Sequence, residues 1–271
     1  MFKQILHLPK EIKAHLKGDL FEACMQLQGK AFRDVPGRKT QQIALGGKSY
    51  FIKQHFGVGW GEIVKNLSTF KLPILSAMTE VKAIEKLDAI GIANTPLVAY
   101  GQLGCNPATL QSFVITKDLG DIVTLEDVCA AWLEASPDMA CMAGVLKDLG
   151  QLAAKFHAAS LCHRDFYLCH FVLKKTEFES GNLNLHLIDL HRMLQNQSPN
   201  GNAVMKDMAG LYFSMLQIGL TAADFSVIKQ HYLPQTNAFW AKVEARAQQL
   251  LAKFNSQKFQ QRLVKEKAAI R

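Results

Sequence analysis

A short loop carries the side chains of this chain that are best suited to chemistry. The stretch CHRDFYLCHF, residues 162–171, contains His163-Arg164-Asp165 and, after four intervening residues, His170. The catalytic loop of protein kinases has the form H-R-D-x-x-x-x-N, in which the aspartate accepts the proton of the acceptor hydroxyl and the asparagine holds a metal ion. Asp165 is therefore a candidate catalytic base, His163 a support of the loop, and His170 a candidate metal ligand in the place of the asparagine.

A zinc site is an alternative interpretation of the same loop. It contains two adjacent pairs, Cys162-His163 and Cys169-His170. Neighbouring residues on an extended chain point to opposite faces, so only one member of each pair could easily face a shared ion. Structural zinc sites favour C-x₂₋₄-C and H-x₃₋₅-H spacings, and neither occurs in this stretch. The phosphotransferase interpretation explains more of the residues.

Three further residues match the other parts of a phosphotransferase site. Lys53 lies at the end of a predicted strand, where kinases place the lysine that contacts the α- and β-phosphates of ATP. Glu80 lies in the first turn of the next predicted helix, the place of the acid that pairs with this lysine. Asp189 follows a short apolar run, like the aspartate that binds Mg²⁺. Each residue alone has a simpler explanation, but the four parts in this order indicate ATP-dependent phosphoryl transfer.

The first part of the chain is predicted to be rich in strands. Residues 1–30 are expected to be helical, because Leu16, Leu20, Ala23 and Leu27 recur at helical spacing. A hairpin follows, joined at Gly46-Gly47. Then come a helix and two strands, over TEVKAIEKLDAIGI, LVAYGQL and SFVITKDL.

After Leu119 the pattern becomes mainly helical. Helices are expected over 124–133 and 139–160 and again from about 206 onward, interrupted by two short β-like runs, FVLKK and LHLIDL. The sequence therefore predicts an α+β protein with a two-lobed, protein-kinase-like architecture. A small sheet-rich lobe would span 1–118 and a larger helical lobe 119–271. Backbone groups at the junction, at Lys117 and Leu119, are expected to contact adenine.

The sequence departs from protein kinases at several points. No G-x-G-x-x-G motif covers the phosphates, and Arg38 and Lys39, beside Gly37, are expected to supply charge instead. No A-P-E motif follows Asp189, which favours a small-molecule or carbohydrate acceptor over a protein. A neutral imidazole suits softer ions than Mg²⁺, so His170 predicts that Mn²⁺ also supports turnover. The alternative is that His170 merely orients the loop.

Composition narrows the class of protein. The chain has 271 residues, of which 49% are hydrophobic and 20% charged, typical of a globular protein. No stretch approaches the roughly 18–20 apolar residues that cross a bilayer, and charged residues interrupt the apolar N-terminus, so we expect a cytoplasmic protein. Its six cysteines form no regular framework, and we expect them to be reduced.

The positive charge is concentrated near the C-terminus. The net charge is +8, and residues 241–271 hold eight basic and two acidic residues, which is +6 of that total. A solvated helix face, an anionic membrane surface and an acidic protein all remain possible. Nucleic acid is not expected, because no recognised binding motif accompanies the charge.

Taken together, these motifs resemble the bacterial lipopolysaccharide core kinases, and most of all the heptose I kinases. HRDFYLCHFVL is similar to the H-R-D-x-Y-x-C-H-F segment of that family. Long matches extend over nearly the whole chain: LQGKAFRDVPGRKT, GKSYFIKQHFGVGWGEIVKNL, PILSAMTEVKAIEKL, NPATLQSFVITKDL, IDLHR and KDMAGLYFSMLQIGLT. The absence of typical protein-kinase motifs is therefore expected of the family.

The resemblance implies an ATP-dependent kinase that acts on the first heptose of the lipopolysaccharide inner core, at the cytoplasmic side of the inner membrane of a Gram-negative bacterium. It implies Asp165 as the base, Lys53 and Glu80 as the phosphate-binding pair, and Asp189 with His170 as ligands of Mg²⁺ or Mn²⁺.

Two further implications concern the loop and the partners. Asp207 resembles the helix aspartate that braces the catalytic loop of kinase-like folds. The family is also associated with acyl carrier protein, an acidic partner that suits the basic tail as well as anionic lipid does. Phosphorylation of Kdo or of the second heptose is the alternative activity, and a non-catalytic, kinase-like binding protein is the alternative class.

Overall fold

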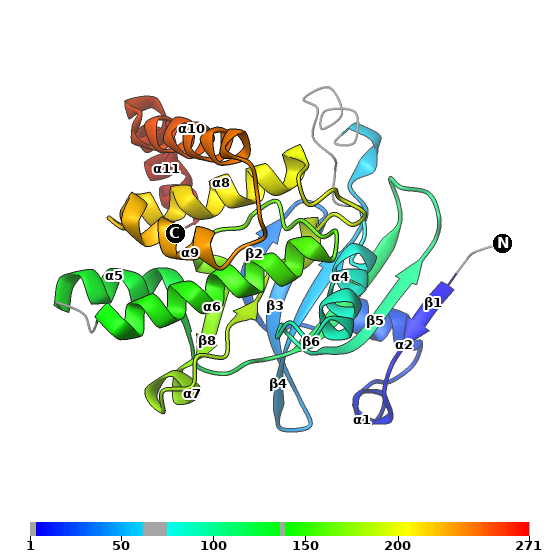
Figure 1. Cartoon of the computed structure of the whole chain (residues 1–271). Coiled ribbons are helices and arrows are strands. Elements are labelled where there is room, and N and C mark those ends of the chain that lie inside the picture. The colour runs from blue at the N-terminus through cyan, green and yellow to red at the C-terminus, as the bar shows by residue number, and fades with distance from the viewer. Residues whose placement is uncertain (1–3, 62–74, 136–138, 271) are drawn as a thin grey trace. The chain divides into compact units, whose positions relative to one another are not determined.

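The computed structural model describes residues 4–61, 75–135 and 139–270. The chain divides into two compact units (Figure 1). The first comprises Met1–Asp121 together with His186–Met193, and the second comprises Ile122–Leu185 together with Leu194–Arg271. The predicted boundary after residue 118 lies close to the point, between Asp121 and Ile122, where the first unit gives way to the second. Residues 186–193 were expected in the helical lobe, but they belong to the first unit.

A six-stranded sheet in the order β1-β5-β6-β4-β3-β2 forms the centre of the first unit. Every neighbouring pair of strands in this sheet is antiparallel. The strands are β1 (Gln4–His7), β2 (Lys30–Val35), β3 (Arg38–Leu45), β4 (Lys48–His55), β5 (Leu97–Leu103) and β6 (Gln111–Lys117).

The predicted hairpin is confirmed as β3 and β4. These strands pair from Leu45 opposite Lys48 to Arg38 opposite His55. Gly46 and Gly47 both have positive φ, +57° and +74°. Two-residue hairpin turns of this kind need left-handed backbone at both positions, which glycine adopts without steric cost.

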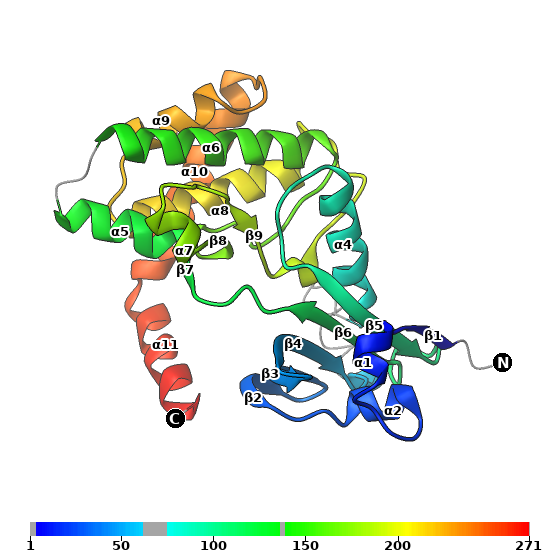
Figure 2. The same cartoon turned by 90° about the horizontal axis from the view of Figure 1, so that it is seen from below.

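Helices pack on the two faces of this sheet. On one face, α1 (Lys10–Lys13) and α2 (Leu20–Met25) cover Ile52 and Phe113 (Figure 2). On the other face, α4 (Met78–Ala89) packs through Val81 against Val114. Adjacent residues of β6 thus point to opposite faces, as the pleat of a strand requires.

The prediction of helix over residues 1–30 is wrong for much of that segment. Residues 4–7 form strand β1, which pairs with β5, and the helical part is broken at Gly18, where φ is +75°. Asp19 then begins α2 by accepting the N–H groups of Phe21 and Glu22. Leu16, Leu20 and Leu27 do pack against the core. Their spacing therefore reflects that they are buried, although they do not lie on one continuous helix.

The second unit is mainly helical, as predicted. Within it α8 packs against α10 and α6 against α9 (Figure 1). The strands β7 (Ile122–Thr124) and β8 (Phe171–Lys174) pair antiparallel. The helices are α5 (Leu125–Ala135), α6 (Met139–Ala158), α7 (Lys175–Glu179), α8 (Asn202–Gln217), α9 (Ala222–Gln230), α10 (Asn237–Asn255) and α11 (Gln257–Ile270). Among the described residues, no helix has both the length and the apolar character needed to cross a bilayer.

Candidate active site

Lys53 of β4 lies at the centre of an ion-pair cluster in the first unit. Its Nζ atom is 2.7 Å from Oε1 of Glu80 on α4 and 3.1 Å from Oδ1 of Asp189. Lys53 points to the α4 face of the sheet, opposite the face to which its neighbour Ile52 points. Burial alone would lower the pKa of Lys53, but the charges of Glu80 and Asp189 outweigh it, and the pKa is raised. The lysine is therefore held as a fixed cation.

Asp189 is placed by the segment that joins β9 (His186–Leu187) to a short 3₁₀ turn. The Leu187 N–H donates to the Ala93 carbonyl, just after α4, at 2.9 Å. Asp189 itself has φ +61°, a left-handed conformation that aspartate tolerates better than most residues. These contacts explain why this segment belongs to the first unit.

His191 also contacts the Asp189 carboxylate. Its Nδ1 lies 2.6 Å from Oδ1, the oxygen that also receives Lys53. Burial by itself raises the pKa of Asp189, but the hydrogen bond to His191 and the charge of Lys53 more than compensate. The pKa of Asp189 therefore lies well below its usual range, and the side chain is a carboxylate at neutral pH.

Basic side chains surround a small cavity beside this cluster. The cavity, of about 30 Å³, is lined by Lys53 and Asp189 and by Arg33, Arg38 and Lys39. The sequence has no glycine-rich phosphate loop, and Arg33, Arg38 and Lys39 place positive charge beside the predicted phosphate-binding lysine. The charge of the cavity suits an anion.

His55 lines the same cavity, although no motif of the sequence pointed to it. It lies two residues after Lys53 on β4 and opposite Arg38 on β3. The side chain is buried, and its Nδ1 has no hydrogen-bond partner among the described residues. Burial, with the charges of Arg38 and Lys53, lowers the pKa of His55 to about 3. His55 is thus a neutral, buried polar group beside this basic cavity.

The catalytic loop of the second unit is held by Asp207 of α8. Oδ2 of Asp207 accepts the backbone N–H of His163 at 2.6 Å, and Oδ1 accepts that of Arg164 at 2.8 Å. Arg164 has φ +74°, which is disfavoured for a residue with a Cβ atom. Such a conformation persists where its surroundings fix it, and the bonds from Asp207 do this next to Asp165.

His170 is tied to the same loop through one ring nitrogen. Its Nδ1 lies 2.6 Å from the backbone carbonyl oxygen of Asp165. Metal-binding histidines commonly use one nitrogen for such a contact, which orients the ring so that the other faces the metal. His170 would therefore bind a metal ion through Nε2.

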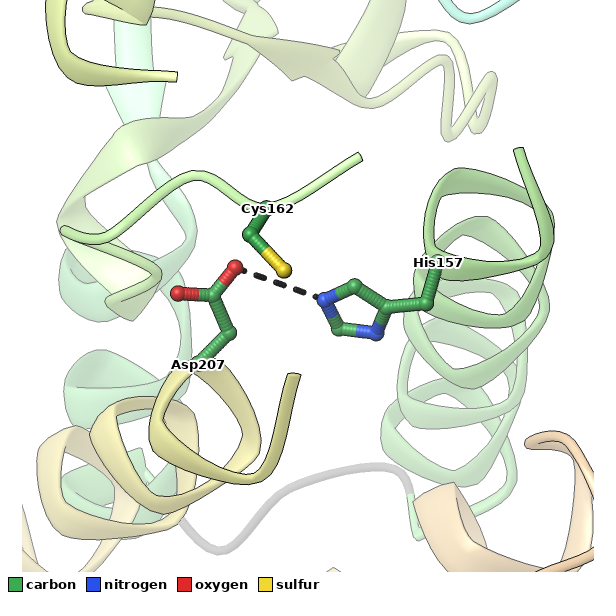
Figure 3. A group of neighbouring side chains, drawn as sticks. All are labelled: His157, Cys162 and Asp207. Atoms are coloured by element: carbon green, nitrogen blue, oxygen red, sulfur yellow. Dashed lines mark hydrogen bonds and ion pairs between the residues drawn. The ribbon is translucent and has the colours of Figure 1, made fainter. Parts of the chain in front are cut away.

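His157, Cys162 and Asp207 form a buried group with the composition of a metal site (Figure 3). Both Asp207 oxygens already accept backbone N–H groups, and His157 contacts Asp207 through Nε2 and Tyr232 through Nδ1. Burial, and after it the charge of Asp207, raises the pKa of the Cys162 thiol far above its usual range. Because Asp207 and His157 already use these oxygen and nitrogen atoms in hydrogen bonds, we interpret this group as a hydrogen-bonded core cluster.

The residues predicted to contact adenine lie at the end of β6. The Lys117 N–H donates to the Pro96 carbonyl at 2.9 Å. Lys117 pairs with Tyr50, on the sheet face that α1 and α2 cover. Its side chain lines a cavity of about 400 Å³ with Tyr50 and Gly120. Any contact of Lys117 with adenine would therefore use its carbonyl group rather than its side chain.

Comparison with known proteins identifies the family of this arrangement. Residues 22–232 match the family model described as lipopolysaccharide kinase (Kdo/WaaP) family. The chain belongs to the lipopolysaccharide kinase family. It is a kinase that phosphorylates a sugar, and the α+β, kinase-like fold predicted from the sequence is confirmed.

Individual relatives of this lipopolysaccharide kinase are named as heptose(I) kinases. The lipopolysaccharide core heptose(I) kinase WaaP of Pseudomonas aeruginosa is 41% identical over 207 residues, which cover 76% of this chain and 77% of the relative. The WaaP of Escherichia coli is 38% identical over 239 residues, covering 84% and 90%. A solved structure of WaaP in complex with acyl carrier protein matches with a TM-score of 0.76 and 32% identity, over 91% of this chain and 99% of the other.

Two residues of the lipopolysaccharide kinase site were not singled out from sequence. His191 follows Asp189 by two positions, and His55 follows Lys53 by two. In a strand, residues two apart share a face, so His55 could have been placed beside Lys53 from the sequence. The contact of His191 depends on the left-handed turn at Asp189, for which the sequence carries no clear signal.

Proposed function

We propose that this kinase transfers the γ-phosphoryl group of ATP to a hydroxyl of the first heptose of the lipopolysaccharide inner core. The observation that carries the proposal is the placement of Lys53 in contact with both Glu80 and Asp189. ATP hydrolysis and transfer place negative charge on the phosphate oxygens, and a fixed cation stabilises it. The names of the relatives support heptose as the acceptor.

The first unit would bind the nucleotide. Lys53 would contact the α- and β-phosphates, with Glu80 holding its ammonium group in place. Arg38 would take part of the work of the missing glycine-rich loop, because it faces the same cavity. The carbonyl of Lys117 and the backbone of Leu119 would hydrogen-bond adenine.

Asp189 and His170 would hold the divalent metal ion. Each side chain by itself suits such an ion: Asp189 is a carboxylate with a lowered pKa, and His170 has an imidazole whose Nδ1 contacts the Asp165 carbonyl, so that it would bind a metal through Nε2. A bound Mg²⁺ or Mn²⁺ would neutralise charge on the β- and γ-phosphates.

Asp165 would act on the acceptor. Its carboxylate would accept the proton of the heptose hydroxyl as that oxygen forms its bond to the γ-phosphorus and ADP departs. Proton transfer to a positioned base typically contributes about 10²–10⁴ in rate. The bonds of Asp207 to His163 and Arg164 would hold Asp165 in position for this step.

The acceptor and the charge of the chain suggest where the kinase works. A glycolipid acceptor would bring the kinase to the periphery of the inner membrane. Basic side chains of α10 and α11, among them Lys253 and Lys258, are exposed. The solved WaaP relative is in complex with acyl carrier protein, and we propose a similar acidic partner for this chain.

Purified enzyme and glycolipid would test the proposed activity. Core glycolipid from cells that lack the kinase is incubated with ATP, Mg²⁺ and either wild-type protein or Asp165→Asn, and mass spectrometry of fragments locates the phosphate. We expect phosphate on the first heptose and a rate at least about 10²-fold lower for the variant. Asp121→Asn, which changes an exposed aspartate, should leave the rate unchanged.

Two outcomes would contradict this assignment. Phosphate found on Kdo or on the second heptose would assign a different acceptor in the same glycolipid. Full transfer by Asp165→Asn would remove Asp165 as the base.

A further inference from the structure

A chain of buried hydrogen bonds connects the catalytic loop to Tyr232, which follows α9. The Tyr232 hydroxyl oxygen lies 2.7 Å from Nδ1 of His157, and Nε2 of His157 lies 3.4 Å from Oδ2 of Asp207. All three side chains are buried. Asp207 in turn accepts the backbone N–H groups of His163 and Arg164 in the loop. Figure 3 shows how His157 and Asp207 face each other from α6 and α8.

The groups at the two ends of this series of hydrogen bonds, Asp207 and Tyr232, decide which atoms donate and which accept. Two backbone N–H groups donate to Asp207, so both of its oxygens act as acceptors, and the His157 nitrogen that faces Oδ2 must carry a proton. In a neutral imidazole the other nitrogen is then an acceptor. Burial, with the charges of Cys162 and Asp207, raises the pKa of Tyr232 above its usual range, so its hydroxyl keeps the proton that it donates to Nδ1.

The ring of Tyr232 is held independently of its hydroxyl. It packs edge-on against His157 with ring centroids 5.6 Å apart, and against Trp240 at the same centroid distance. Removing the hydroxyl alone therefore leaves the aromatic packing in place. The hydroxyl has a separate consequence, because its bond to Nδ1 favours the His157 tautomer that carries its proton on Nε2.

We propose that Tyr232 is a positioning residue for phosphoryl transfer. Its hydroxyl holds His157 in the tautomer that donates to Asp207, and Asp207 holds the backbone of the catalytic loop. The loop needs such support because Arg164, directly before Asp165, adopts a left-handed conformation. This inference rests on the catalytic role proposed above for Asp165.

Tyr232→Phe tests the inference with a matched control in the same unit. Tyr212 is also buried and stacks on Phe225 at 4.1 Å, but no hydrogen bond from it reaches the loop among the contacts described above. We expect Tyr232→Phe to lower kcat by about three- to tenfold, the effect of losing one buried hydrogen bond, with the KM for ATP changed less than about twofold. Tyr212→Phe should change neither by more than about 1.5-fold.

A double-mutant cycle tests whether the effect passes through His157. In a His157→Phe background, the additional change Tyr232→Phe should have no further effect on kcat, because the bond is already lost. Multiplicative effects of the two changes would overturn the inference. So would equal kcat values for Tyr232→Phe and wild type, or a fall that is the same for Tyr232→Phe and Tyr212→Phe.

Nuclear magnetic resonance of ¹⁵N-histidine-labelled protein gives a readout that does not require activity. Two-bond ¹H–¹⁵N correlations should show the His157 proton on Nε2 in wild type and in Tyr212→Phe, and a changed or mixed tautomer in Tyr232→Phe. An Nε2–H tautomer that is unchanged in Tyr232→Phe would overturn the inference even if the acceptor differs from the one proposed. A changed tautomer without any transfer to heptose would instead contradict the proposed function.

Discussion

At the scale of single residues, charge decides which groups of the first unit can bind a nucleotide. Lys53 is buried, but Glu80 and Asp189 keep it charged, and Asp189 is kept charged by His191 and Lys53. Neither ion would be stable in this place without its partners. Because the partners come from a strand, a helix and a turn, the site exists only when all three are assembled.

The metal preference is a prediction about His170. We expect Mn²⁺ to support turnover at least as well as Mg²⁺ in wild type, because an imidazole nitrogen suits the softer ion. His170→Asn supplies an oxygen ligand and should lower the ratio of kcat/KM with Mn²⁺ to that with Mg²⁺ by about tenfold. Steady-state kinetics with each metal measure the ratio. If His170→Ala matches wild type with both metals, His170 does not bind the ion.

The pH dependence of stability is a prediction about His55. Its folded-state pKa of about 3 lies below the unfolded-state value of about 6.5. The unfolded chain therefore binds an extra proton between these pH values, and the free energy of unfolding decreases as the pH falls through this window. Urea unfolding at pH 7, 6 and 5 measures this free energy. Between pH 7 and pH 5 it should decrease by about 2 kcal/mol less in His55→Gln than in wild type.

His15 provides the matched control for this measurement. It is an exposed histidine of the same unit, and His15→Gln should keep the wild-type pH dependence. Equal losses for wild type and His55→Gln would show that burial does not hold His55 neutral.

At the scale of elements, close packing of α6 against α9 positions the helix that carries His157. Gly150 of α6 lies against the backbone of α9, where an added Cβ atom would come within 2.8 Å of the Ile228 carbonyl oxygen. Gly144 lies in the same helix, and an added Cβ atom there would meet nothing within 4 Å. Of these two glycines, only Gly150 is required by the packing of the helices.

Alanine substitutions at these two positions should act in opposite directions. Gly144→Ala should stabilise the protein by about 0.5–1 kcal/mol, because alanine loses less backbone entropy in a helix. Gly150→Ala should destabilise it by about 1–3 kcal/mol, because the helices must move apart. Thermal unfolding measures both, and a higher Tm for Gly150→Ala would contradict the packing.

At the scale of the whole molecule, the uneven charge predicts where the acidic partner proposed above would bind. Lys253 and Lys258, of α10 and α11, are exposed. Their combined replacement by glutamate should weaken binding to acyl carrier protein by at least about tenfold at low salt, because close charge pairs steer and stabilise association. Isothermal titration calorimetry measures the Kd. Replacing exposed Lys13 and Lys17 by glutamate changes the net charge equally and should leave the Kd within about twofold.

Much of the architecture could be predicted from local sequence. The hairpin at Gly46-Gly47, the helix that begins near Glu80 and the helical second unit all follow from turn chemistry and periodicity, which act between residues close in the chain. The first 30 residues could not, because pairing of residues 4–7 with β5 is a long-range contact and overrides a helical spacing of leucines.

The sequence by itself determined which residue types are present for phosphoryl transfer and in which order, since Lys53, Glu80, Asp165 and Asp189 are recognisable by motif and spacing. Only the tertiary structure decided what holds them. The turn at Asp189 joins the sheet unit, Nδ1 of His55 is buried with no hydrogen-bond partner among the described residues, and Tyr232 reaches the catalytic loop through His157. These contacts join residues far apart in the chain, and their energies depend on burial and distance, which exist only in the folded protein.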